Sequence, residues 1–388
     1  MNTLLFGIDH LNMCDGVDYT FFCNSVISNY RSPNRLNHCG LVDGEMGLVL
    51  LAVSEYFRTN NCYFLKRALD SINVFVNDEL VHYSLGYGLT GLAWVTHLLQ
   101  KENLIDDESV EEWLNDVDIA LEKEFYLKLS DNNIDYFNGA SGILFYFLHA
   151  RNNITLINNY FTFLHNKTKS KDWSTSVRLK GILYKYINLG VPHGLCGLLL
   201  LLLQAKEKNI DVDQLIYCMI EELLSYKIAG SHYHYPPHFW IGKMPDYNPK
   251  IGLAWCYGDL STGYAMYKAG VMLNNQEILR EGIEIVEKTL SRTDCIDNDF
   301  TLCHGYPSIF YIFYKLYQIT NDSKFLFAFE LWQSKAKTTF EQGLRTPNKF
   351  NVNFWGNASL FYGFPGFFLP LLSSGNTNFN YWDKCLLL

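Results

Sequence analysis

The sequence predicts an all-α fold in which seven helical hairpins close into an α/α toroid. Two observations lead there: a short glycine signature recurs seven times, and each copy opens a strongly apolar segment. A third is that the segments between the copies read as amphipathic helices. Each unit is then a hairpin of one buried and one amphipathic helix, and a closed ring of hairpins buries a continuous inner layer.

The signature is a glycine, two residues, a second small residue and an apolar run. Its copies start at Gly44, Gly88, Gly139, Gly194, Gly258, Gly305 and Gly363. A loop that enters a helix at close quarters favours residues without bulk or with positive φ, which is sufficient reason for most of these glycines. Loops in the same register should open at one end of the ring, so function should gather there.

The inner helices are predicted from the apolar runs after the signatures, such as Leu48–Val53, Ile143–Leu148 and Ile309–Phe313. Runs of this kind suit helices buried on all sides, although strands could also produce them. The outer helices are predicted from apolar residues with helical spacing. Two such sets are Val110, Trp113, Leu114, Val117 and Leu121, and Ile278, Leu279, Ile283, Val286 and Leu290.

Composition sets the remaining bounds. With 48% hydrophobic and 18% charged residues, the 388-residue chain is globular, and we expect residues 1–388 to form a single domain. A net charge of −9 and the lack of a basic patch argue against nucleic acid as a partner. The N-terminus is no secretory signal, and the longest apolar stretch, around Leu195–Leu203, is too short to span a bilayer. No transmembrane segment and a cytoplasmic location are therefore expected.

The loops before the signatures differ in chemistry. Cysteine stands two places before the first glycine only at Cys256 and Cys303, and histidine stands one place before it only at His193 and His304. Cys256, Cys303 and His304 form a plausible Cys₂His set on adjacent loops, which is typical of catalytic zinc with an open fourth position. The alternative is that both cysteines pack as small hydrophobes in buried loops.

His193 should face the mouth of the ring, the end at which the signature loops open. It lies two repeats before His304 and is not one of the three metal ligands, a position that suits a general acid or base. Asp135 is the only carboxylate just ahead of the third signature, and a helix cap or loop carboxylate is its alternative role. The loop Ser231–Trp240 contains three histidines, but Pro236 and Pro237 argue against a second metal cluster. We expect an aromatic surface loop or a lid beside the mouth.

Three motifs, Trp255–Gly258, Leu302–Gly305 and Pro192–Gly194, resemble those of the lanthionine synthetase C-like (LanC-like) cyclases. The resemblance covers nearly the whole chain. It implies a stand-alone class I lanthipeptide cyclase, a lanthionine synthetase that adds peptide cysteine thiols to dehydroalanine or dehydrobutyrine and so forms thioether rings. It also implies that Cys256, Cys303 and His304 hold Zn²⁺, that His193 protonates the enolate, and that Asp135 assists it.

The implied partners are a dehydrated precursor peptide with its leader, a separate dehydratase and an exporter, with the chain at the periphery of a membrane-associated complex. One departure is Gly252, where many family members have an arginine; Lys250 is nearby but out of register. Another is serine as the second small residue at Ser261 and Ser308. Two alternatives stay open: a protein prenyltransferase, and a zinc-bearing LanC-like protein that binds thiols or peptides, or forms glutathione-type adducts, without ring formation.

Overall fold

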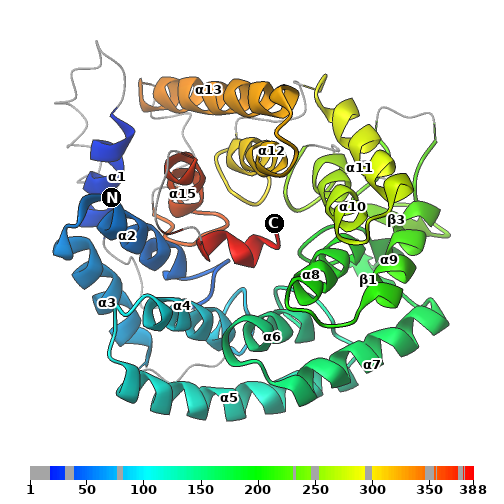
Figure 1. Ribbon diagram of the computed structural model, residues 1–388, viewed down its shortest axis with the longest axis horizontal. Helices are drawn as coiled ribbons and strands as arrows, with labels where there is room; N and C mark the ends of the chain where they lie inside the picture. Colours follow the sequence, from blue (N-terminus) through cyan, green and yellow to red (C-terminus); the bar gives the residue numbers. More distant parts are fainter. Residues whose placement is uncertain are drawn as a thin grey trace.

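The structure is a computed structural model. It describes residues 18–30, 39–76, 82–229, 233–245, 253–292, 299–345, 354, 356–374, 379 and 381–388. Within these ranges the helices form two concentric layers around a common axis, which Figure 1 shows end on. The predicted α/α ring is confirmed.

The inner layer consists of helices that begin at the glycine signatures. They are α2 (Met46–Thr59), α4 (Leu89–Lys101), α6 (Ala140–Tyr146, continued by the π-helical η1, Phe147–Arg151), α8 (Leu195–Glu207), α10 (Asp259–Met272), α12 (Tyr306–Thr320) and α15 (Pro365–Ser373). Most of their residues are buried, as the uninterrupted apolar runs predict. Gly258, before α10, has a φ of 107°, a conformation that side chains disfavour.

The outer layer consists of amphipathic helices: α3 (Cys62–Val76), α5 (Asp107–Ser130), α7 (Ile154–Ser170), α9 (Asp213–Ser225), α11 (Gln276–Thr289) and α13 (Ser323–Arg345). The predicted apolar faces point inward, with Leu114 and Leu121 of α5 and Val286 of α11 fully buried. At the start of α5, Asp106 caps the helix by accepting the backbone N–H of Ser109 at 3.2 Å.

The seventh pair differs from the predicted hairpin. The outer partner of α15 is α1 (Tyr19–Asn29), which comes from the other end of the chain and lies between α13 and α3 (Figure 1). Tyr19 packs on Phe340 of α13 with ring centroids 5.8 Å apart, and Phe22 stacks on Phe368 of α15 at 6.1 Å. Within the described residues, the ring is thus closed where α1 packs against α13 and α15.

Backbone hydrogen bonds also join the seven signature loops into a closed cycle. In each bond the N–H of a residue in one loop donates to a carbonyl oxygen in the next loop, at 2.7–3.1 Å. The pairs, donor first, are Val42 and Gly86, Gly86 and Phe137, Tyr136 and Pro192, Val191 and Cys256, Cys256 and Cys303, Cys303 and Phe361, and Leu360 and Leu41. The residue two places before each first glycine is buried, and the next residue is exposed or half-buried. All seven loops therefore present one residue each to the same mouth, as the common register predicts.

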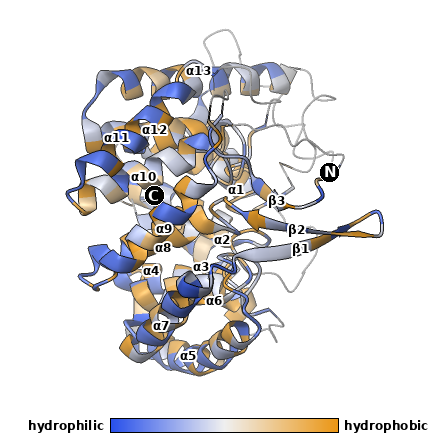
Figure 2. Cartoon of the chain, turned by 90° about the vertical axis from the view of Figure 1, so that its right-hand side faces the viewer, coloured by the Kyte–Doolittle hydropathy of each residue, from blue (hydrophilic) through white to orange (hydrophobic). Residues whose placement is uncertain are grey.

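Two further features surround this ring. A three-stranded antiparallel sheet in the order β1 (Ser174–Leu179), β2 (Ile182–Asn188) and β3 (His238–Ile241) was not predicted. Figure 2 shows β1 and β2 extending beyond the helices on one side of the ring. The segment Tyr381–Leu388, which includes the 3₁₀ helix η3 (Tyr381–Leu386), lies inside the ring (Figure 1). In the described part of the chain, no helix combines the length and apolar character that a membrane crossing requires.

Candidate functional site

Two neighbouring loops bring Cys256 and Cys303 together below the mouth. The N–H of Cys256 donates to the carbonyl of Cys303 at 3.1 Å, and both side chains are buried. Ser308 supports the first loop, because its Oγ accepts the N–H of Trp255 at 3.2 Å and donates to the carbonyl of Gly305 at 2.9 Å. At this position, serine in place of glycine thus supplies a hydrogen bond between the two loops.

Cys256, Cys303 and His304 present ligand atoms that all lie within 4.8 Å of one another. The Sγ of Cys256 and the Nδ1 of His304 are 3.9 Å apart. Tetrahedral zinc with Zn–S bonds of about 2.3 Å and Zn–N bonds of about 2.0–2.1 Å places neighbouring ligand atoms about 3.5–3.8 Å apart. The donor types and separations therefore fit a zinc ion. No other such group of three is found among the described residues.

Asp299 is a neighbour of this set that the sequence analysis missed. Its Oδ2 lies 3.3 Å from the Nε2 of His304, while its Oδ1 accepts the N–H of Thr301 at 2.7 Å. A carboxylate behind a ligating histidine fixes the ring and its tautomer, and leaves the other nitrogen for the metal. Here the free nitrogen is Nδ1, which faces Cys256.

The electrostatics of this cluster favour a thiolate. A hydrogen bond from Cys256 lowers the pKa of Cys303, and the hydrogen bond and positive charge of His304 lower it further, against the opposing effect of burial. Reciprocally, Cys303 raises the pKa of His304. Tyr362, whose pKa is raised by burial and by the charge of Cys303, lies with its ring centroid 5.7 Å from that of His304. One thiolate is therefore available as a soft ligand.

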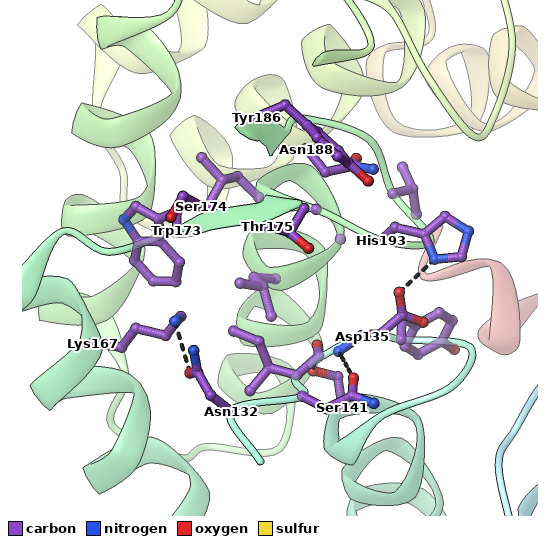
Figure 3. Close-up of a pocket in the computed structure, with 18 of the residues that line it drawn as sticks. Asn132, Asp135, Ser141, Lys167, Trp173, Ser174, Thr175, Tyr186, Asn188 and His193 are labelled. Carbon is purple, nitrogen blue, oxygen red and sulfur yellow. Dashed lines mark hydrogen bonds and ion pairs between the residues drawn. The ribbon is translucent and has the colours of Figure 1, made fainter. Parts of the chain in front are cut away.

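His193 and Asp135 form a second pair at the mouth. The Nδ1 of His193 lies 2.5 Å from the Oδ2 of Asp135, as Figure 3 shows. The other oxygen of Asp135 accepts the N–H of Asn138 at 2.8 Å. Asp135 is therefore both a loop-capping carboxylate and the hydrogen-bond partner of His193.

Asp135 also determines how readily His193 is protonated. Burial by itself would lower the pKa of His193, but the hydrogen bond and the charge of Asp135, together with the charge of Cys303, raise it above the ordinary value. The side chain is 35% exposed, and its ring meets that of Phe137 edge to face at 5.8 Å. This imidazole is held in one orientation and remains accessible, as an acid or base must be.

A cavity of about 680 Å³ opens beside this pair (Figure 3). His193 and Asp135 line one part of it, and Lys167 and Trp173 line another. Tyr257 also belongs to the lining. His238 also lines it, with its ring centroid 5.5 Å from that of Tyr257. Burial and the charge of His193 lower the pKa of His238 to about 4, so the imidazole is neutral near pH 7.

The histidine-rich loop does not form a second metal cluster among the described residues. His234 is buried, and its Nε2 accepts a hydrogen bond from the Nζ of Lys288 at 2.9 Å. Its backbone N–H donates to Asp259. His238 begins strand β3 rather than a flexible lid. His232, Lys250 and Gly252 lie outside the described residues.

Comparison with known proteins identifies a family and a solved structure that resemble this chain. The family model described as "Lanthionine synthetase C-like protein" matches residues 36–387. A solved structure titled "Nisin cyclase" superposes with a TM-score of 0.75 at 19% sequence identity, covering 94% of this chain and 96% of that one. At that identity the second match concerns the fold, and it agrees with the ring described above.

Proposed function

This chain belongs to the lanthionine synthetase C-like family, and from that membership we propose that it is a lanthipeptide cyclase. Its reaction is the addition of a peptide cysteine thiol to a dehydroalanine or dehydrobutyrine, which forms a lanthionine or methyllanthionine ring. The observation that carries the proposal is the presence, at one mouth, of a Cys₂His set and a carboxylate-bound histidine. The first suits thiol activation and the second suits proton transfer.

Cys256, Cys303 and His304 would hold Zn²⁺, with Asp299 orienting His304. Bound zinc supplies a Lewis acid that lowers the pKa of a coordinated substrate thiol and keeps it as a thiolate at neutral pH. The side chains of Cys256 and Cys303 are buried, whereas His304 is exposed. The three ligands are therefore accessible from the side of His304, which faces the mouth.

His193 supplies the proton that completes the reaction. As the substrate thiolate forms its bond to the β-carbon, the π electrons of the double bond move onto the α-carbon and its carbonyl as an enolate. His193, whose acid form Asp135 favours by raising its pKa, donates a proton to the α-carbon. The sum is the addition of sulfur and hydrogen across a double bond, and nothing is released.

The substrate is therefore a ribosomal peptide whose serines or threonines have already been dehydrated. A dehydratase must act before this enzyme, since the thiol adds to a residue that has already lost water. A leader-bearing precursor, a separate dehydratase and an exporter are the partners that this role calls for.

The decisive experiment incubates the zinc-loaded protein with a dehydrated, cysteine-containing peptide. Because ring closure is an isomerisation, the peptide mass does not change, and the reaction is followed by loss of alkylation with N-ethylmaleimide. Rings should form with the wild type and not with the chelator-treated protein, and about one zinc per chain should be measured by elemental analysis.

His193→Ala separates the proton donor from the metal set. This variant should keep its zinc and cyclise at least about 100-fold more slowly, in line with the loss of a general acid. Full activity in His193→Ala would remove His193 from the mechanism. Zinc in the wild type without any ring formation would instead favour a protein that binds thiols or peptides.

A further inference from the structure

One wall of the cavity beside His193 is formed by the β-sheet and not by the helical ring. In the sheet, Thr175 pairs with Tyr186, and Asn188 pairs with His238. Because side chains alternate along a strand, these four belong to one face of the sheet, and all four line the cavity. Opposite them lie the third signature loop and the end of α7 (Figure 3).

Lys167 stands at the part of the cavity away from His193. Its Nζ donates to the Oδ1 of Asn132 at 2.8 Å and lies 5.4 Å from the centre of the Trp173 ring, which is itself buried. In the described part of the chain, Lys167 forms no ion pair with a carboxylate, and the charge of Asp172 favours its ammonium form. An ammonium has three N–H groups, so donors remain for a ligand after the bond to Asn132.

The lining indicates what that ligand is. Most of the lining side chains carry an amide, a hydroxyl or a titratable group. Asn133, Ser141 and Ser174 belong to it in addition to the residues above. Such a lining suits polar main chain better than a large apolar side chain. The nearby Asp131 and Asp135 disfavour an anion, which leaves a neutral carbonyl oxygen as the partner for Lys167. A volume of about 680 Å³ is large enough for a short peptide segment.

We propose that this cavity is the subsite for the peptide segment that flanks the reacting residues, and that Lys167 binds a main-chain carbonyl oxygen of that segment. The inference rests on the proposed function, which places the reacting residues at His193, in the same cavity. Recognition through main-chain groups does not depend on the side chains of the peptide. The subsite can therefore accept segments of different sequence.

The test is a binding measurement that needs no catalysis. The probe is a short, fluorescein-labelled linear peptide of Gly and Ala around one Ser and one Cys, with Ser in place of the dehydro residue so that no ring can close. Its affinity for the zinc-loaded protein is measured by fluorescence anisotropy. Lys167→Met removes the ammonium and keeps a good helix former. Lys169→Met is the matched control, since Lys169 lies on the same helix, is exposed and does not line the cavity.

Lys167→Met should weaken binding about tenfold, equivalent to about 1.4 kcal/mol, and Lys169→Met should leave it unchanged. Lys167→Arg, which keeps the charge and the donors, should restore most of the affinity. Equal affinity of Lys167→Met and the wild type would overturn the proposal. So would an equal loss in Lys169→Met, which would indicate general charge attraction, or no binding of the probe to the wild type.

The outcome is independent of the ring-formation assay. If the wild type cyclises a dehydrated peptide while Lys167→Met binds the probe normally, the proposed function stands and the subsite does not. If Lys167→Met alone loses the probe while no rings form, the subsite stands and the reaction assignment fails.

Discussion

Asp135 has two contacts, and other repeats show which of them is architectural. Ser84 and Ser359 occupy the same register in their own loops and accept the N–H of Tyr87 and Tyr362, at 3.2 and 3.3 Å. The bond from Asn138 to Asp135 is the same loop cap. The second oxygen, which reaches His193, has no counterpart in those serines. Serine at this position therefore separates the two roles.

Asp135→Ser should keep the loop and remove the partner of His193. Without that hydrogen bond and charge, the pKa of His193 falls. Because the acid form of His193 exists below its pKa, cyclisation should be lost at a lower pH than in the wild type. The pH dependence of kcat measures this shift, with Ser359→Ala as the control that removes a cap alone. An unchanged profile in Asp135→Ser would leave Asp135 as a loop carboxylate.

Asp299 stands at a position that can be compared between repeats, six residues before the first glycine of the signature. Six residues before the first glycine stand Asn133, Asn188, Asp299 and Asn357, and each accepts the backbone N–H two residues later through its Oδ1. The acid occurs in the repeat that carries His304. This contrast is present in the sequence, and it could have identified Asp299 once the turn was recognised as common to these repeats.

Asp299→Asn should preserve the turn and lose the charge behind His304. We expect zinc affinity to fall about 10–100-fold, the usual effect of removing an outer carboxylate. Competition with a chromophoric chelator gives the affinity without an activity assay. Asn357→Asp, which adds a carboxylate to the same turn in the next repeat, is the control. Unaltered zinc affinity in Asp299→Asn would mean that Asp299 serves the turn alone.

At the scale of elements, the segment Tyr381–Leu388 supports both functional loops from inside the ring. The carbonyl of Cys385 accepts the hydroxyl of Tyr136, next to Asp135, at 2.9 Å. The carbonyl of Leu386 accepts the Nε1 of Trp255, next to Cys256, at 2.8 Å. Asp383 anchors the segment through Lys315 at 2.6 Å. The metal loop and the acid loop thus share one buried support.

Tyr136→Phe tests this support. Losing a buried hydrogen bond should lower the free energy of unfolding by about 1–3 kcal/mol, because the carbonyl of Cys385 is left without its donor. Tyr146→Phe is the matched control, since its side chain is buried, its hydroxyl donates to Asp118, and neither residue lines the cavity. Both variants should lose stability, but only Tyr136→Phe should lower kcat. Equal kcat values would show that the segment fills space and does not position the loops.

The sequence predicts the helices well and the sheet poorly, for a physical reason. The run Leu198–Leu203 directly follows a glycine signature, so α8 can be predicted from residues that are close together in the sequence. Strands β2 and β3 come from separate gaps between repeats, and their pairing of Tyr186 with Trp240 is non-local. The Cys₂His set was predictable because two loops share a register. The cavity was not, because the wall formed by the sheet depends on that strand pairing.

At the scale of the whole molecule, α1 completes the outer layer. Phe22, 5% exposed, packs against α13 and α15, whereas Phe21 on the same helix is 57% exposed. Phe22→Ala should therefore lower the free energy of unfolding by about 3–5 kcal/mol. Phe21→Ala should change it by less than about 0.5 kcal/mol. Denaturant unfolding compares the two, and similar midpoints would argue against closure of the ring by α1.

The hydrogen bond from Leu360 to Leu41 has a consequence for synthesis of the protein on the ribosome. A chain emerges from its N-terminus, so the first repeat is made long before the residues that cover it. Until residues 356–374 appear, α1 and α2 have apolar surface with no seventh inner helix beside it. The nascent arc must remain open and unaggregated while six repeats accumulate. A slow final step, in which distant ends of the chain meet, is then expected to limit the rate at which functional enzyme appears.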